Sequence, residues 1–119
     1  MRRFLLTAAL VAAVLPGGAL AHAFLDHAVP AVGATVPSAP RQVQLFFTQE
    51  LEPAFSGATI AAANGQPVAA GAATVDPQNK MEMVLNLPSL APGSYKVSWH
   101  AVSVDTHRTE GSFSFEVHP

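Results

Sequence analysis

The chain has 119 residues, half of them hydrophobic, and carries a formal net charge of −2 at neutral pH. It contains no cysteine, which excludes disulfide bonds, thiolate metal sites and thiol nucleophiles. No basic run or patch occurs in it, so nucleic acid is not an expected partner.

The first 21 residues have the layout of a secretory signal peptide. The basic start Met1-Arg2-Arg3 precedes an apolar run from Phe4 to Leu15 and the small-residue pattern Ala19-Leu20-Ala21. The apolar run is shorter than the roughly 20 residues that span a bilayer. We therefore expect cleavage after Ala21 and no stable membrane insertion afterwards, which leaves residues 22–119 as one exported domain that begins with His22.

Short strands separated by turns follow along the exported part. Period-two patterns predict strands at 41–48, 58–62, 80–87, 95–101 and 112–117, with a short first strand in 22–29 and a weak one in 66–75. The proline-rich segment 30–40 is predicted to be a loop that tucks Val32 and Val36 inward, and Asn64-Gly65 predicts a tight turn. Without a sustained helical period, the expected fold is all-β, a Greek-key sandwich or small barrel.

The same alternation predicts which side chains are buried. One face of each main strand is apolar, with Val43, Leu45, Phe47, then Met81, Met83, Leu85, Leu87, then Tyr95, Val97 and Trp99. Because Met81 and Met83 alternate within a strand and no Met-rich loop accompanies them, we assign both to the core rather than to a Cu(I) site.

The loop Asp105-Thr106-His107 is the clearest candidate for chemistry. Residues two apart in an extended segment project to one side, so Asp105 and His107 can offer an oxygen and a nitrogen to the same point. An Asp-x-His loop between strands can equally serve to form the turn without binding a metal. Cleavage before His22 would add a free amine next to its own imidazole, a two-nitrogen chelate. His27, five positions later, could lie near this centre or be solvated.

Nucleophilic and glycosidase chemistry are not favoured. The sequence has no Gly-x-Ser-x-Gly elbow and no spacing that assembles a serine, a base and an orienting carboxylate. Glu50 and Glu52 could be paired acids with Asp105, but so small a chain offers little sequence to form a substrate cleft. We therefore predict that the protein is not an enzyme.

Three stretches resemble the CopC family, the periplasmic copper-binding and copper-resistance proteins of Gram-negative bacteria. They are HAFLDHAVPAVGATVPSAP, LFFTQELEPAFSGATI and GSYKVSWHAVSVDTHRTEGSFSFEV, and the likeness runs over essentially the whole exported part. It implies a cupredoxin-like (immunoglobulin-like) β-barrel that binds Cu(II) in the periplasm without catalysing a reaction. The implied ligands are the amine and imidazole of His22, the carboxylate of Asp105 and the imidazole of His107, a nitrogen and oxygen set that suits tetragonal Cu(II).

Two departures from the family pattern refine this expectation. Founding members carry a Met- and His-rich Cu(I) loop, whereas the matching AAANGQPVAAGAAT has neither residue type, so we expect a Cu(II) site only. Gln49 replaces a frequent acidic residue near the copper, with Glu50 beside it, and could hydrogen-bond a ligand. The resemblance also implies a CopD-like inner-membrane copper transporter as partner.

Two other functions stay open at this stage. An N-terminal His with a second His on copper also occurs in polysaccharide monooxygenases, which would make the protein a histidine-brace oxidase. The third reading is a metal-free β-sandwich interaction module.

Overall fold

The computed structural model of the chain describes residues 22–119, so the predicted signal peptide lies outside the described residues. The described part is all-β apart from a single short 3-10 turn, η2 (Pro53–Phe55). Its strands are β1 (Leu25–Val29), β2 (Thr35–Val36), β3 (Gln42–Phe47), β4 (Gly57–Ala62), β5 (Thr74–Asp76), β6 (Asn79–Asn86), β7 (Gly93–Val102) and β8 (Arg108–Val117). None of these residues forms a helix with the length and apolar character needed to cross a bilayer.

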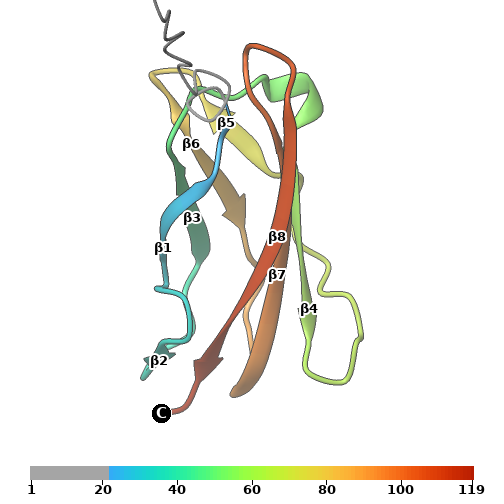
Figure 1. Cartoon of the computed structure of the whole chain (residues 1–119). Coiled ribbons are helices and arrows are strands. Elements are labelled where there is room, and N and C mark those ends of the chain that lie inside the picture. Colours follow the sequence, from blue (N-terminus) through green and yellow to red (C-terminus); the bar gives the residue numbers. More distant parts are fainter. Residues whose placement is uncertain (1–21) are drawn as a thin grey trace, which may run out of the picture.

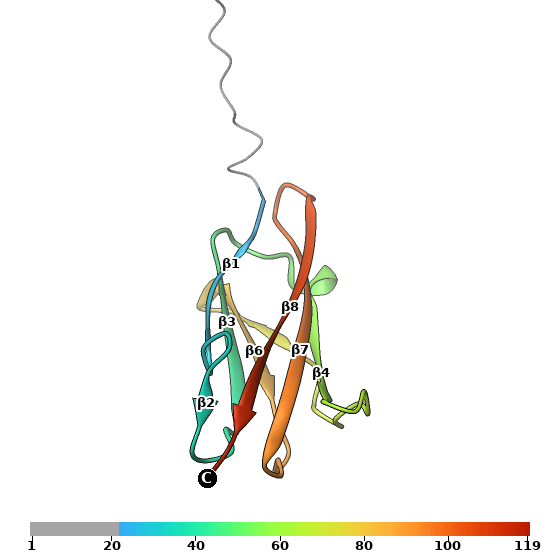
Figure 2. The same cartoon turned by 60° about the horizontal axis from the view of Figure 1, so that its bottom comes forward.

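Two four-stranded sheets face each other, as Figures 1 and 2 show from two directions. Their strand orders are β1-β3-β6-β5 and β2-β8-β7-β4, so the chain changes sheet at every connection from β1 to β5 and again between β6 and β7. All pairings are antiparallel except the short parallel contact between β2 and β8. The predicted all-β sandwich is confirmed.

The core lies between the sheets and is built from the inward face of each strand. Fully or nearly fully buried residues include Val43, Leu45, Phe47, Met83, Leu85, Tyr95, Val97, Trp99, Phe113, Phe115 and Val117. Trp99 packs edge-on against Phe47, with ring centroids 5.2 Å apart. Opposite Trp99 in the β7–β8 pair is Gly111, where an added Cβ would come within 2.7 Å of Trp99 Cζ2. Gly111 therefore leaves the space that the indole fills.

Some local predictions were wrong. Met81 is 41% exposed, because the pairing of β3 with β6 ends at Glu82 and Met81 extends beyond the cover of β3. Val32 is also exposed, while Val36 packs against the core as predicted. The segment 30–40 contains β2, which was not predicted. Of the weak strand predicted in 66–75, only Thr74 and Val75 lie in a strand, β5, which extends to Asp76.

The β7–β8 hairpin carries the candidate loop to one end of the sandwich. Its register runs in one direction from Gly93↔Val117 to Val102↔Arg108, after which residues 103–107 close the hairpin. Residues 22–24 and η2 lie at this same end (Figure 1). The first described residues and the loop between β7 and β8 therefore lie at the same end of the sandwich.

Candidate metal centre

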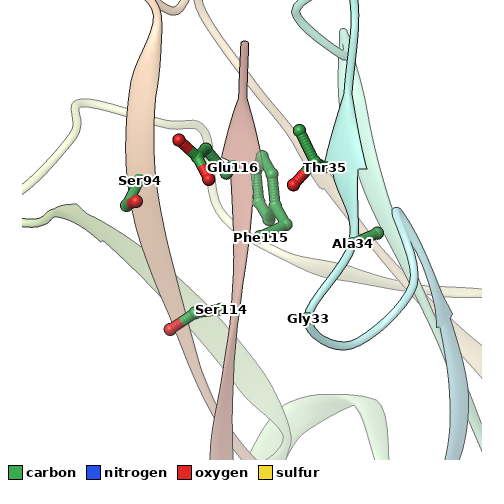
Figure 3. Close-up of a pocket in the computed structure, with 7 residues that line it drawn as sticks. All are labelled: Gly33, Ala34, Thr35, Ser94, Ser114, Phe115 and Glu116. Atoms are coloured by element: carbon green, nitrogen blue, oxygen red, sulfur yellow. The ribbon is translucent and has the colours of Figure 1, made fainter.

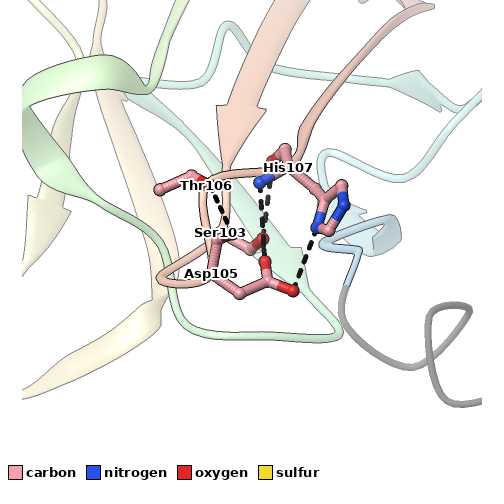
Figure 4. Close-up of polar contacts among 4 residues, drawn as sticks. All are labelled: Ser103, Asp105, Thr106 and His107. Atoms are coloured by element: carbon pink, nitrogen blue, oxygen red, sulfur yellow. Dashed lines mark hydrogen bonds and ion pairs between the residues drawn. The ribbon is translucent and has the colours of Figure 1, made fainter.

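A tight loop joins β7 to β8 and sets the geometry of the centre. Ser103 N donates to His107 O at 3.0 Å, and Thr106 N donates to Ser103 O at 2.8 Å. Thr106 has a φ of 73°, a left-handed conformation that β-branched residues rarely adopt. This turn, rather than an extended segment, brings Asp105 and His107 to the same side, with Asp105 Oδ2 3.0 Å from His107 Nδ1 (Figure 4).

The Asp105 carboxylate is held from inside the molecule by Ser103. The Ser103 side chain is buried, with 1% of the residue exposed, and its Oγ donates to Asp105 Oδ1. This hydrogen bond, with further contributions from His107, lowers the pKa of Asp105 against the opposing effect of partial desolvation. Asp105 is therefore an anionic oxygen donor at neutral pH, with Oδ2 turned toward His107.

His22 approaches the same loop from the start of the exported part. The imidazole rings of His22 and His107 lie 4.5 Å apart between centroids, with their planes 39° apart. At that separation a nitrogen of each ring can reach a common ion. The structure therefore brings His22, Asp105 and His107 to one end of the sandwich.

Asp105 and His107 form a hydrogen-bonded pair whose spacing is also compatible with a shared small metal ion. Metal–nitrogen and metal–oxygen bonds of about 2.0–2.1 Å place adjacent donors of a square site roughly 2.9 Å apart, close to the 3.0 Å between Asp105 Oδ2 and His107 Nδ1. Within residues 22–119, no three His, Asp or Glu side chains already surround one point. Instead, His107 contacts both other candidate ligands: its Nδ1 lies next to the Asp105 carboxylate, and its ring lies next to the ring of His22. The amine of His22 would exist only after cleavage.

The residues predicted to support the ligands occupy different positions. Val104 N donates to Glu50 O at 3.3 Å, so the backbone of Gln49 and Glu50 runs beside the loop, with Gln49 half-buried and Glu50 exposed. In the described part, the side chains of Gln49 and Glu50 make no hydrogen bond to the ligand loop.

His27 faces away from the candidate ligands. Its ring stacks on Phe46 at 4.4 Å between centroids, and its Nδ1 lies 2.7 Å from Asp26 Oδ2. A β-bulge between Leu25 and His27 turns both Asp26 and His27 outward. His27 thus belongs to a separate, solvated pair.

Sequence reasoning missed the hydroxyl groups around the centre. Ser103 bonds the carboxylate, and Thr48 and Thr109 bond the backbone of the segment that carries His22. The hydrogen bond of Ser103 could have been predicted, because Ser103 lies only two residues before Asp105 in the same loop. Nothing in the pattern of Thr48 or Thr109 signals their partners, which lie far along the chain.

A surface hollow lies at the opposite end of the β7–β8 hairpin. It is lined by Gly33, Ala34, Thr35, Ser94, Ser114, Phe115 and Glu116 (Figure 3). Ser94 pairs with Glu116 near the start of β7, roughly 25 Å of strand from the candidate loop. The hollow and the candidate metal ligands are therefore separate features.

The fold and this centre define a class: a small two-sheet β domain with nitrogen and oxygen donors gathered at one end. The chain belongs to the CopC family, because the family model described as CopC domain matches residues 25–118. The resemblance drawn from the sequence is thereby confirmed.

Individual relatives agree with this assignment. Protein YobA of Escherichia coli K12 is 40% identical over 98 residues, which cover 82% of this chain and 79% of YobA. The crystal structure of CopC from Methylosinus trichosporium OB3b matches with a TM-score of 0.78 and 36% identity, covering 82% of this chain and 95% of that one. PcoC of Escherichia coli, described as a methionine-rich copper resistance protein, matches with a TM-score of 0.75 and 35% identity, covering 82% and 100%.

Proposed function

We propose that the exported chain binds Cu(II) through the amine and imidazole of His22, the carboxylate of Asp105 and the imidazole of His107. The observation that carries this proposal is that His107 contacts both other candidate ligands, with its Nδ1 3.0 Å from Asp105 Oδ2 and its ring 4.5 Å from the ring of His22 between centroids. Holding or handing over the ion in the periplasm, without catalysing a reaction, would serve copper homeostasis and resistance.

Copper is the ion that the donors and the family favour. Imidazole, amine and carboxylate suit Cu(II), which also heads the affinity order of divalent first-row metals and so competes well against zinc. A solved relative, PcoC, is described as a methionine-rich copper resistance protein. This chain has three methionines: Met1 lies in the predicted signal peptide, Met83 is buried in the core, and Met81 is the only methionine exposed among the described residues. This composition supports a Cu(II) site without a thioether Cu(I) site.

Exposure of the centre supports a role in handover. The side chains of His107 and Asp105 are 54% and 37% exposed, so a partner could reach a bound ion without unfolding the domain. A CopD-like inner-membrane copper transporter is the partner that we propose. Export by the signal peptide would place this chain on the periplasmic side of that membrane, where it could reach the transporter.

Electron paramagnetic resonance on Cu(II)-loaded protein tests the ligand set. The protein that begins at His22 is compared with a variant carrying one extra residue before His22, which turns the amine into an amide. We expect the spectrum to change because one nitrogen donor is lost. An unchanged spectrum would rule out the amine as a ligand.

Alanine substitutions separate copper binding from the other functions. Asp105→Ala and His107→Ala are expected to weaken Cu(II) binding strongly, whereas Asp26→Ala and His27→Ala remove a similar exposed pair and should not. Unchanged binding in the first two variants would favour a metal-free interaction module. Oxidised oligosaccharides formed from chitin or cellulose with the copper form and a reductant would instead favour a histidine-brace oxidase.

A further inference from the structure

Two threonines hold the segment that carries His22 between the two sheets. Thr109, on β8, donates its hydroxyl to Ala23 O across 86 positions of sequence. Thr48, directly after β3, accepts a hydrogen bond from Phe24 N at 3.0 Å through Oγ1 and lies 3.3 Å from His22 O through the same oxygen. Each threonine comes from a different sheet.

These hydrogen bonds are made by residues that lie before the first strand. β1 begins at Leu25, so residues 22–24 precede the first strand, and chain ends without such ties are usually frayed. Ala23 is fully buried, and the backbone of Thr48 also donates to Phe24 O at 2.9 Å. The Thr109 hydroxyl therefore satisfies the carbonyl of a fully buried residue, Ala23, in a partly buried hydrogen bond. The hydrogen bonds of Thr48 to Phe24 N and His22 O lie at the exposed side of the same segment.

The connection to the candidate ligands is direct. Thr109 lies two residues after His107 on the same strand, and Ala23 directly follows His22. The hydrogen bond from Thr109 to Ala23 thus ties the backbone next to one candidate ligand to the backbone next to the other. Without this bond the His22 ring would lose the restraint that keeps it 4.5 Å from the ring of His107.

We propose that Thr48 and Thr109 are positioning residues that fix His22 against the Asp105–His107 pair and so set the affinity of the site. This inference rests on the proposed role of His22 as a ligand. Removal of the Thr109 hydroxyl leaves the carbonyl of buried Ala23 without this donor, and removal of the Thr48 hydroxyl frees Phe24 N. Residues 22–24 are then less ordered, so His22 must be ordered again upon binding. Loss of groups that orient metal ligands typically reduces metal affinity by about 10–100-fold.

Valine and serine substitutions test this in the protein that begins at His22. Thr48→Val and Thr109→Val keep the side-chain shape and remove the hydroxyl, whereas Thr48→Ser and Thr109→Ser retain it. Thr59→Val changes an exposed threonine on the outer face of β4 and is the control. Cu(II) affinity is measured by competition with a chelator, and each copper-loaded variant is examined by electron paramagnetic resonance.

The expected result is a loss of about 10–100-fold in affinity for the double valine variant, with a spectrum that moves toward that of His22→Ala. The serine variants and Thr59→Val should keep the affinity and spectrum of the parent. A double valine variant with the parent's affinity and spectrum would overturn the inference. If that variant does not fold, Thr109→Val alone is judged by the same criteria.

The His22→Ala variant separates the two proposals. If it binds Cu(II) like the parent, His22 is not a ligand and the proposed function is wrong at that residue. If it binds weakly while the valine variants bind like the parent, only the positioning role of the threonines is wrong.

Discussion

Replacing Ser103 by alanine should weaken copper binding without unfolding the domain. Ser103 Oγ is the side-chain donor to Asp105 Oδ1, and the remaining contact of that oxygen, from His107 N, is long at 3.5 Å. If His107 gives its imidazole to an ion, as we propose, Ser103 becomes the main group that orients the carboxylate. We expect an affinity loss of about 10–100-fold, the range for partners that orient metal ligands.

The lower copper affinity should result from poorer orientation of the Asp105 carboxylate rather than from loss of its negative charge. Without the Ser103 hydrogen bond the pKa of Asp105 rises toward its ordinary value near 3.9, so the carboxylate is still ionised at pH 7.5. The loop should also stay closed, because the backbone bond from Ser103 N to His107 O does not involve the hydroxyl.

Quenching of tryptophan fluorescence by Cu(II) provides the assay, since Trp99 is the single tryptophan of the chain. Ser103→Ala is titrated at pH 7.5 in competition with a chelator, beside Ser112→Ala, which alters an exposed serine on the outer face of β8. Equal affinities in these two variants would refute the role assigned to Ser103.

Two further predictions concern stability. Gly111→Ala should lower the free energy of unfolding by about 1–3 kcal/mol, because its Cβ would lie 2.7 Å from Trp99 Cζ2. A Cβ at Gly71 would meet nothing within 4 Å, so the free energy of unfolding of Gly71→Ala should differ from that of the parent by less than about 0.5 kcal/mol in the same urea titration. Because folding lowers the pKa of Asp105, its contribution to the stability of the metal-free protein is complete above its ordinary pKa near 3.9 and is lost as pH falls through the lower value in the folded chain. Urea titrations between about pH 5 and pH 2 should therefore show a smaller pH effect for Asp105→Asn than for the parent. Glu116→Gln, at an exposed carboxylate on β8, is the control and should match the parent. A larger destabilisation by Gly71→Ala than by Gly111→Ala would contradict the contact between Gly111 and Trp99. A larger pH effect in Asp105→Asn than in the parent would contradict the stabilising hydrogen bonds of Asp105.

Much of the fold could be predicted because most strands place one face on the core. In β7, buried and exposed positions alternate from Tyr95 to Ala101, so a period of two is visible in the sequence itself. β2 has only two residues and is defined by pairing with the end of β8, so no period could reveal it. The exposure of Met81 depends on where β3 stops covering β6, which is a matter of register between strands.

The candidate site was predictable in composition but not in geometry. Asp105 and His107 are two positions apart, yet they meet through a left-handed residue, and Thr106 is not a residue type that signals such a turn. The position of His22 depends on hydrogen bonds to Thr48 and Thr109, whose partners are distant in sequence. Spacing from His22 likewise could not show that a bulge turns His27 outward.

The contact between the His22 and His107 rings joins residues that are 85 positions apart in the sequence. An unfolded chain holds these residues far apart, so a ligand that needs both binds the folded state alone. By thermodynamic linkage, free copper at 100 times its dissociation constant would stabilise such a fold by about 2.7 kcal/mol. Copper loading would therefore follow export and folding, and resistance to unfolding or proteolysis would report how much of the protein is carrying its ion.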